Sequence, residues 1–513
     1  MTEGRRDLGS ILSFIPLIHR SSVLFWPSKA HEILKTISRG PDHSRVDSGE
    51  VLFDAILNLR DAVGLSDDIL ASNAADSYAL FFDELMSRMD SRMWFGEVVP
   101  WLARLLLRLP SLLETHYQDL VEKFGEKQAG LRIVDQQEAG IVILSQELVA
   151  ALLACSLFCL FPIAGRVGKN LPSTINFDYL FAALHPNTRQ SQEQKIKCLI
   201  HYFERICQCI PTGYVSFERK VLSVEPRFEG MTYPEAGFWR NSSISLCPFE
   251  VFTMGFIEDQ NHEALEVDFA NEFLGGGALH MGCVQEEIRF MISPELIAGM
   301  LFMASMKKNE AIEIVGAERF SSYMGYGSSF RFVGDFLDQK PVDLMGRRKT
   351  RIVAIDALYN PRLRQYRVEE LLRETNKAFC GFSDQSKYLC YLKIFQEAGN
   401  NTSMPLGLTN SLPEGTEPFK RDPEIKSIIQ WLAASQALRS FIHYYTFGEA
   451  ALQRLEQVTR WILLHGWTVG DLWSILVEYS AQRSNREINI GFFAWLLPLL
   501  NHSPEDSSSL MSE

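Results

Sequence analysis

The sequence predicts an α/β protein with a mainly parallel or mixed sheet, preceded by a helical accessory domain and followed by further helices. Two observations support this prediction. Before about residue 210, apolar residues recur at three-to-four spacing, which is typical of amphipathic helices. After Pro211, short β-like runs alternate with helical patterns, which favours a sheet whose strands are joined through helices.

The composition limits the class of protein. Of the 513 residues, 46% are hydrophobic and 22% are charged, which is near the globular average and excludes collagen-like and wholly disordered chains. The net charge of -13 argues against a general binder of duplex DNA, which needs a basic surface. A local anion pocket built from backbone N–H groups is still compatible with this charge.

Residues 1–210 are predicted to form the helical accessory domain. Its clearest helical patterns cover residues 51–63, 79–89, 94–109 and 192–209. The apolar run from Leu148 to Ile163 is shorter than the roughly 20 residues of a membrane-spanning helix, and Glu147 precedes it. We therefore expect a buried core helix at this position and no membrane span.

The cysteines predict buried, reduced thiols. There are nine of them, most lie inside apolar runs, and no two have C-x-x-C spacing. This pattern argues against a zinc ribbon.

Residues 211–500 are predicted to form the sheet domain with its C-terminal helices. Strands are expected over 265–269, 312–315, 351–358 and 441–447. A helix is expected to begin at Pro423 with Asp422 as its N-cap, because proline is favoured at the first helical position. After Gly448 the chain is helical again to Leu500, and residues 501–513 are Ser- and acid-rich, which predicts a disordered tail.

The segment from Val267 to Phe290 is the one most suggestive of chemistry. It combines a strand, three consecutive glycines and a helix that starts at Gln285. Consecutive glycines let the backbone turn sharply and approach a ligand, and their N–H groups can cradle a phosphate or a sugar oxygen in front of the helix.

Three acidic residues, Asp268, Glu286 and Glu287, flank this loop. Acidic residues in a first helical turn often only complement the helix dipole, and this alternative stays open for Glu286 and Glu287. If they converge with Asp268 and Asn271 on one small volume, crowding raises the pKa of one carboxyl, as a general acid requires.

At this point the sequence resembles the poly(ADP-ribose) glycohydrolases, and most of all their plant members. The resemblance rests on the glycine triplet, a seven-residue spacer and Gln-Glu-Glu, and it covers most of the chain. Further similar motifs lie at residues 257–259, 267–271, 323–326, 353–358, 376–382 and 445–448. The resemblance implies a macrodomain-like mixed-sheet core, and hydrolysis of the ribose–ribose O-glycosidic bonds of poly(ADP-ribose) to release ADP-ribose.

The resemblance also implies roles for single residues. Glu287 would protonate the leaving ribose oxygen and then activate water, Glu286 would bind ribose hydroxyls, and Asp268 would position and stabilise charge. The implied substrate-binding residues are Ile257, Glu258, Asn271, Gly275, Gly276, Gly277, Gln285, Tyr326, Phe419 and Phe447. No metal and no cofactor are implied. The expected partner is poly(ADP-ribose) on modified proteins, with no sequence-specific nucleic acid and no membrane.

One part of the sequence departs from the family. The family has a second glycine-rich loop before the helix at Asp422, which wraps the diphosphate with backbone N–H groups. Residues 411–421 here retain little of it, and Pro413 and Pro418 have no N–H to donate. Lys420 and Arg421 would replace part of the anion binding as point charges. The alternative to an active glycohydrolase is therefore a catalytically weak or inactive ADP-ribose-binding paralogue.

Two further expectations come from function alone. The polymer is made mostly on chromatin, so we expect the chain in nucleus and cytoplasm and in the DNA damage response. We expect it to be a monomer.

Overall fold

The structure, a computed structural model, describes residues 14–20, 23–124, 131–163, 174–184, 190–224, 231–259, 263–384, 407–411 and 421–500. The chain divides into two compact units. Unit 1 contains residues 1–219, 270–306 and 314–350, and unit 2 contains residues 220–269, 307–313 and 351–513. The boundaries predicted near residues 210 and 500 divide the chain in a different way and stay a prediction.

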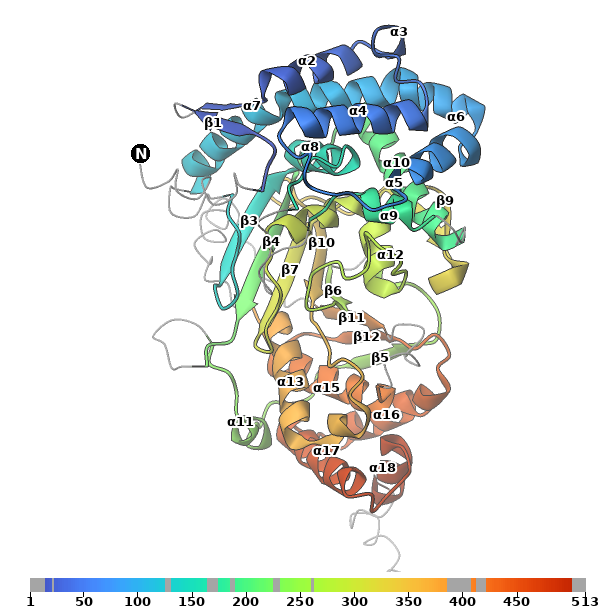
Figure 1. Cartoon of the computed structure of the whole chain (residues 1–513). Coiled ribbons are helices and arrows are strands. Elements are labelled where there is room, and N and C mark those ends of the chain that lie inside the picture. The colour runs from blue at the N-terminus through green and yellow to red at the C-terminus, as the bar shows by residue number, and fades with distance from the viewer. Residues whose placement is uncertain are drawn as a thin grey trace, which may run out of the picture. The chain divides into compact units, whose positions relative to one another are not determined.

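The first part of unit 1 is helical, and α2 packs against both α4 and α7 (Figure 1). Its helices are α2 (Ser28–Ile37), α3 (Pro41–Ser44), α4 (Gly49–Ala62), α5 (Ala74–Ala79), η1 (Leu80–Leu85), α6 (Arg88–Met93), η2 (Trp94–Val98), α7 (Val99–Phe124), α8 (Gln146–Leu157), α9 (Asp178–Ala182) and α10 (Gln190–Gln208). The helices predicted over 51–63 and 192–209 are confirmed as α4 and α10.

The predicted helix over 79–89 is wrong in its extent. Helix α5 ends at Ala79, one stretch of π-helix follows as η1, and Met86 is extended. The next helix, α6, starts separately because the Ser87 hydroxyl accepts a hydrogen bond from Asp90 N–H at 3.2 Å and acts as its N-cap. A serine inside an apolar pattern thus divides one predicted helix into two.

The apolar run after Glu147 forms the buried helix α8, as predicted. All but one of its residues are buried. The helix ends before Ile163 because Cys159 adopts a left-handed conformation (φ 51°), and Leu160 N–H then bonds to Cys155 C=O at 3.0 Å. Within the described ranges, no helix has the length and apolar character needed to cross a membrane.

Eight strands form one mixed sheet in the order β3-β4-β7-β10-β6-β11-β12-β5. The strands are β3 (Gly140–Ser145), β4 (Tyr214–Val221), β5 (Phe249–Phe252), β6 (Ala264–Asp268), β7 (Glu310–Gly316), β10 (Arg348–Ala354), β11 (Gly407–Ser411) and β12 (Ile442–Tyr445). The pairs β10–β6, β6–β11, β11–β12 and β12–β5 are parallel, whereas β3 and β4 are antiparallel. The predicted mixed sheet is therefore confirmed.

The first part of the chain, predicted to be mostly helical, also contributes strand β3 to the sheet. Its residues Ile141 and Ile143 are β-branched and pair with Glu218 and Ser216 of β4. The sequence does not distinguish this strand from a helix, because a short apolar run between helices fits a buried helix equally well. Two small antiparallel ribbons, β1 (Ile18–Arg20) with β2 (Val23–Phe25) and β8 (Ser321–Met324) with β9 (Arg331–Asp335), lie outside the main sheet.

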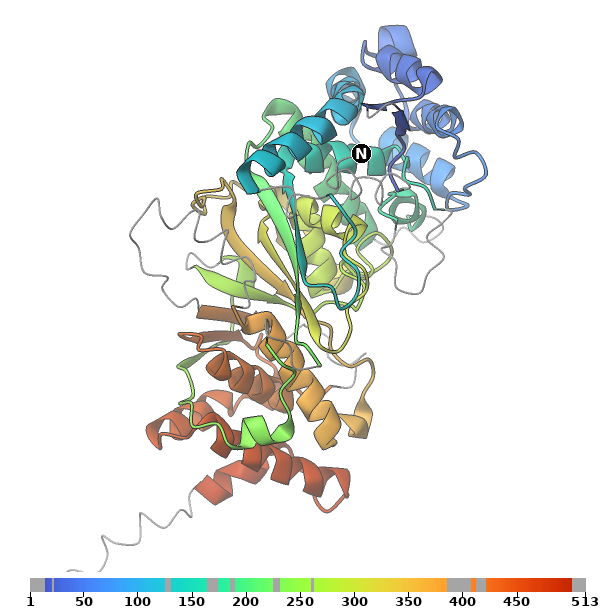
Figure 2. The same cartoon turned by 90° about the vertical axis from the view of Figure 1, so that its left-hand side faces the viewer.

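Unit 2 packs helices against its parallel strands (Figures 1 and 2). They are α11 (Ala236–Arg240), α13 (Val368–Phe382), α15 (Pro423–Gln436), α16 (Leu455–Leu464), α17 (Val469–Ser484) and α18 (Phe492–Leu500). The N-cap of α15 is confirmed, because Asp422 Oδ1 accepts hydrogen bonds from Glu424 N–H at 3.0 Å and Ile425 N–H at 3.4 Å. The buried rings of Trp239, Trp431 and Trp473 belong to this core.

None of the cysteines in the described ranges forms a disulfide, and six are buried. Burial raises the pKa of Cys198 and Cys380 to about 12 and of Cys283 to about 11. These thiols are therefore protonated at neutral pH, in agreement with the predicted buried thiols. The predicted tail and Cys390 lie outside the described residues.

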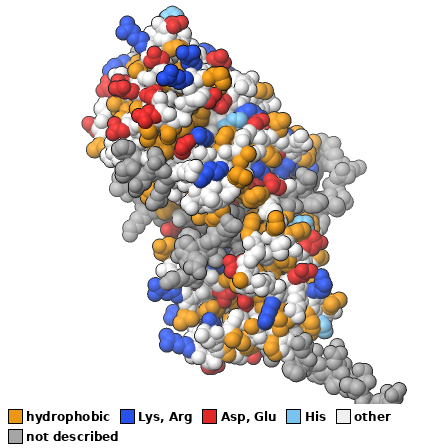
Figure 3. Space-filling view, turned by 90° about the vertical axis from the view of Figure 1, so that its right-hand side faces the viewer, with side chains coloured by type: hydrophobic (Ala, Val, Ile, Leu, Met, Phe, Trp, Pro, Cys, Tyr) orange, Lys and Arg blue, Asp and Glu red, His pale blue; other side chains and the backbone are white. Residues whose placement is uncertain are grey.

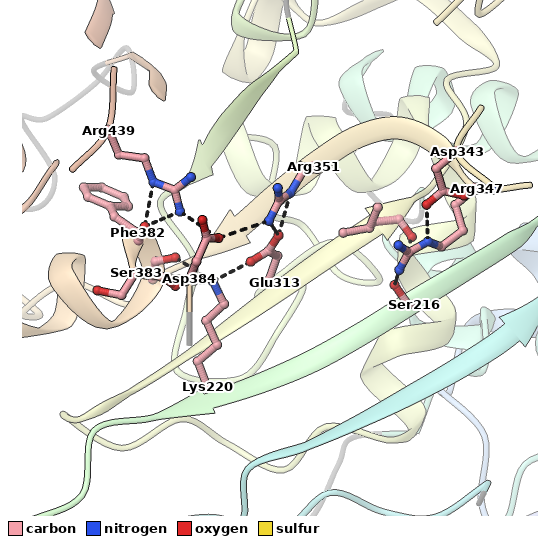
Figure 4. A network of polar contacts seen from close by, with 12 residues as sticks. Ser216, Lys220, Glu313, Asp343, Arg347, Arg351, Phe382, Ser383, Asp384 and Arg439 are labelled. Carbon is pink, nitrogen blue, oxygen red and sulfur yellow. Dashed lines mark hydrogen bonds and ion pairs between the residues drawn. The ribbon is translucent and has the colours of Figure 1, made fainter. Parts of the chain in front are cut away.

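A chain of charged side chains in unit 2 runs from the buried Lys220 and Glu313 to the exposed Asp384 (Figure 4). Glu313 on β7 accepts from Arg351 Nε at 2.8 Å and pairs with Lys220. Arg351 also lies 3.7 Å from Asp384, which pairs with Arg439 at 3.4 Å. Burial by itself would raise the pKa of Glu313, but Arg351 and Lys220 outweigh it and hold that pKa well below its usual range.

We predict that Glu313→Gln lowers the free energy of unfolding by about 3–5 kcal/mol, because it leaves buried cations without their carboxylate. The native state depresses this pKa, so the stabilisation is full above the ordinary value of 4.5 and is lost as the pH falls below it. Urea unfolding at pH 7 and at pH 4 should show a difference between wild type and variant that shrinks in acid.

The matched control is Glu456→Gln, which breaks an exposed pair with Arg460. It should cost less than about 1 kcal/mol at either pH. A Glu313→Gln deficit that stays constant with pH would contradict the assignment.

Candidate active site

The glycine loop leads from the end of β6 to helix α12 (Gln285–Ile292) and belongs to unit 1 from Ala270 onward. Gly275 and Gly276 have left-handed φ angles of 84° and 46°. A Cβ on Gly276 would lie 2.6 Å from Glu286 Oε2, and a Cβ on Gly282 would lie 2.7 Å from Glu287 Oε1. Glycine is needed here both for the turn and for the close approach of the two carboxylates.

Glu286 is held by the backbone before and inside the glycine triplet. Its Oε2 accepts from Asn271 N–H at 2.9 Å and its Oε1 from Gly275 N–H at 2.7 Å. The side chain is 3% exposed, so a buried carboxylate is satisfied by backbone donors. The Asn271 amide oxygen in turn accepts from Phe273 N–H at 3.0 Å and tightens the same loop.

Glu287 closes the other half of the loop. Its Oε1 accepts from Gly277 N–H at 2.9 Å and its Oε2 from Val284 N–H at 2.9 Å. The second bond reaches back from the third position of α12 to the residue before the helix, as in the second half of a capping box. Both acids therefore do more than complement the helix dipole, since they determine the shape of the glycine loop.

Helix α10 supplies a residue that the sequence analysis missed. Lys195 is fully buried, and its Nζ donates to His280 C=O at 2.7 Å and to Gly282 C=O at 2.6 Å. Burial lowers the pKa of Lys195 to about 8, although the neighbouring Cys283 and Glu287 act to raise it. The available signal was a lysine at a core position of the helix, three and four residues before the buried Cys198 and Leu199.

The structure brings together Tyr326 and Gln285, two of the implied substrate-binding residues. The Tyr326 hydroxyl accepts from Gln285 N–H at 3.1 Å, at the first residue of α12. Gly327 N–H donates to Cys283 C=O at 3.0 Å and ties the same segment to the end of the glycine loop. The half-buried Tyr326 ring therefore stands at the N-terminus of α12, beside the loop that holds the two acids.

The other predicted residues lie in unit 2, at one edge of its parallel sheet. Asp268 is the last residue of β6 and is buried, Ile257 and Glu258 form η3 (Ile257–Asp259) after β5, and Phe447 follows β12. The carboxyl ends of parallel strands share an edge, and ligands of such sheets bind there. Phe447 has a left-handed φ of 49°, a strained conformation that is frequent at functional sites.

The second glycine-rich loop is described only at its two ends. Residues 412–420, and with them Phe419 and Lys420, lie outside the described residues. Arg421 donates from Nε to Leu358 C=O at 3.0 Å and from Nη2 to Ala357 C=O at 3.3 Å. At least two of its N–H groups thus bind the chain after β10, which reduces the anion binding that we expected from this side chain.

The described residues contain no cluster of His, Cys, Asp and Glu that could hold a metal ion. The two carboxylates at the glycine loop accept hydrogen bonds from backbone N–H groups, which orient them. Carboxyl groups are among the side chains that transfer protons in catalysis.

Comparisons with known proteins agree over almost the whole chain. A family model described as the macro domain fold of poly(ADP-ribose) glycohydrolase matches residues 236–454, and one described as its helical domain matches residues 86–219. "Poly(ADP-ribose) glycohydrolase 1" of Arabidopsis thaliana is 51% identical over 97% of this chain and 98% of the relative. "Probable poly(ADP-ribose) glycohydrolase 2" of the same plant is 50% identical over 97% and 100%. "Poly(ADP-ribose) glycohydrolase 1" of Caenorhabditis elegans is 34% identical over 50% of this chain and 32% of the relative.

We predict that Lys195→Met loosens the glycine loop and lowers the free energy of unfolding by about 2–5 kcal/mol, because two carbonyls lose a charged donor. Hydrogen exchange should become faster at the amides of residues 277–284. The control Lys197→Met, on the same helix, breaks only a partly exposed pair with Glu193 and should cost about 0.3–0.5 kcal/mol. Equal loop exchange in both variants would show that Lys195 does not hold the loop.

Proposed function

The chain belongs to the poly(ADP-ribose) glycohydrolase family, and on that premise we propose that it hydrolyses the ribose–ribose O-glycosidic bonds of poly(ADP-ribose) and releases ADP-ribose. The observation that supports this most is the pair of acids, Glu286 and Glu287, bonded through both carboxylate oxygens to the backbone of a glycine loop. This arrangement occurs in a chain that is 51% identical to a plant glycohydrolase over nearly its full length.

Glu287 is the proposed general acid and base. Its carboxyl group donates a proton to the leaving ribose oxygen as the bond to the anomeric carbon breaks, and then accepts a proton from the attacking water. Protonation of the leaving oxygen is needed because a ribose alkoxide is a poor leaving group, and such transfer contributes about 10²–10⁴-fold to rate. The developing charge on the sugar is that of an oxocarbenium ion, which nearby carboxylates stabilise.

The other predicted residues have supporting roles in this proposal. Glu286 binds ribose hydroxyls next to the scissile bond, and Asp268 supplies negative charge at the end of β6. The rings of Tyr326 and Phe447 are flat apolar surfaces suited to the ligand, with Ile257 and Glu258 at the adenine. The N–H groups of Gly275 and Gly277 bond the acids, and that of Gly276 donates to Phe273 C=O at 3.0 Å. In this proposal the three glycines therefore let the backbone approach the sugar closely, and they do not donate to it as predicted from the sequence.

No observation favours the weak or inactive alternative. It was based on residues 411–421, of which only Ser411 and Arg421 are described. The identity to two plant relatives, each matched over nearly its whole length, supports retention of the activity. Release of ADP-ribose from automodified polymer by the purified chain is the direct test.

We also propose the setting in which the enzyme acts. It would act as a monomer on polymer attached to modified proteins, in nucleus and cytoplasm, as part of the DNA damage response. On the face drawn in Figure 3, basic side chains are interspersed with acidic ones, which agrees with a net charge of -13 and with no sequence-specific nucleic-acid partner. Light scattering and imaging of the tagged chain would test the monomer and the location.

We predict that Glu287→Gln lowers kcat on polymer by at least about 10²-fold while the affinity for ADP-ribose stays within about threefold. Glutamine retains the shape and one hydrogen-bond acceptor but transfers no proton. Release of ADP-ribose followed by chromatography, together with calorimetric titration, separates the two quantities. Wild-type turnover by this variant would remove Glu287 from the acid–base role.

We predict that replacing residues 412–420 with the family's glycine-rich sequence strengthens ADP-ribose binding by about tenfold or more. Each N–H aimed at a phosphate contributes about 1.5–3 kcal/mol, and Pro413 and Pro418 have none. Arg421 is kept, because it bonds to the chain after β10. A serine-rich loop of the same length is the control, and equal affinity of both replacements would show that the glycine pattern is not what limits binding.

A further inference from the structure

Two exposed rings stand side by side at the end of the glycine loop. The Tyr179 ring on α9 and the His280 ring have centroids 5.0 Å apart, at an interplanar angle of 47°. Tyr179 is 46% exposed, and His280 is exposed as well. Exposed rings of this kind offer flat surfaces on which a nucleic-acid base can stack.

The chain around Tyr179 is firmly held, although Tyr179 itself faces solvent. The buried Asn176 side chain accepts from Phe161 N–H at 3.0 Å and donates to Phe161 C=O at 2.9 Å. Asp178, the residue directly before Tyr179, is fully buried and accepts from Ala71 N–H at 2.9 Å. These buried polar contacts fix the start of α9 and so fix the position of one exposed ring.

His280 is connected to Glu287 through two hydrogen bonds. Its backbone N–H donates to Gly277 C=O at 2.9 Å, and Gly277 N–H donates to Glu287 Oε1 at 2.9 Å. The buried Lys195 holds the same turn, because its Nζ donates to His280 C=O and to Gly282 C=O. The ring pair therefore stands on the turn that positions the proposed general acid.

The covalent structure of the substrate predicts which part of it lies beside that acid. The bond that is cleaved joins the anomeric carbon of one ADP-ribose unit to the 2′-oxygen of the adenosine ribose of the next. The adenine of this leaving unit is attached to the neighbouring ribose carbon. A group that protonates the 2′-oxygen therefore has the adenine of the leaving unit close by.

We propose that Tyr179 and His280 form a stacking site for the adenine of the leaving ADP-ribose unit. The site would be occupied by polymer and left empty by ADP-ribose itself, which carries only the unit on the other side of the scissile bond. This inference rests on the proposed hydrolysis, and it names the part of the substrate that the glycine-loop side of the site recognises.

The charge of His280 is compatible with stacking. Partial burial lowers its pKa, and the Lys195 cation lowers it further, although Asp178 acts in the opposite direction. Both effects favour the neutral imidazole, which presents a flat, uncharged ring. Neutral rings stack on all bases with little dependence on sequence.

The test compares a ligand that reaches the site with one that does not. In the Glu287→Gln background, where turnover is blocked, calorimetry would measure the affinity for short linear oligo(ADP-ribose) and for ADP-ribose. Tyr179→Ala and His280→Ala should each weaken oligomer binding by about tenfold and leave ADP-ribose binding unchanged. Tyr179→Phe should keep wild-type affinity, because the ring is retained.

The control is Phe238→Ala on α11, which removes a ring of similar exposure, 44%, from unit 2. With Glu287 restored, Tyr179→Ala should lower kcat/KM on polymer by a similar factor. Unchanged oligomer affinity in both alanine variants would overturn the proposal, and so would an equal loss of ADP-ribose affinity, which would place the rings at the product side. If wild type released no ADP-ribose, the proposed function would fail instead, and the binding comparison would still decide whether the rings contact the oligomer.

Discussion

The shape of the site depends on four backbone N–H groups that are bonded to two carboxylates. Glu286 bonds to Asn271 and Gly275, and Glu287 bonds to Gly277 and Val284. The dependence is mutual, because the loop leaves its N–H groups without secondary-structure partners and the buried acids need donors. Neither acid can be displaced without opening the loop, so the proposed proton donor and the glycine loop form one hydrogen-bonded element.

The same element explains why helices contribute to a site built around a sheet. Lys195 of α10 bonds to two carbonyls of the glycine loop, and α9 presents Tyr179 next to His280 of that loop. The helical part of unit 1 thus supports the loop from its buried side and extends it on its exposed side. In the proposed reaction on a polymer, this extension would meet the leaving ADP-ribose unit.

Unit 2 holds its predicted site residues in place in another way. Its parallel strands end at one edge, where Asp268 closes β6, η3 follows β5 and Phe447 follows β12. The core that packs against these strands contains three buried tryptophans. The buried pairs around Glu313 tie β7 to β10 and to the end of α13. Such charges stabilise only when every partner is present, so they favour one arrangement of these strands over others.

The sequence alone determined the family, the α/β class and the residues of the glycine loop, because these depend on local patterns: a strand, a glycine triplet and Gln-Glu-Glu in fixed order. It also determined α15, whose N-cap Asp422 and first-position Pro423 act within one helical turn. It did not identify β3, because the pairing with β4 joins residues that are far apart in the chain. Lys195 and Tyr179 were decided only by the tertiary structure, since each acts on a segment more than 80 residues away. A lysine becomes a support for the loop, and a tyrosine the neighbour of a histidine ring, only when the fold brings that loop beside it.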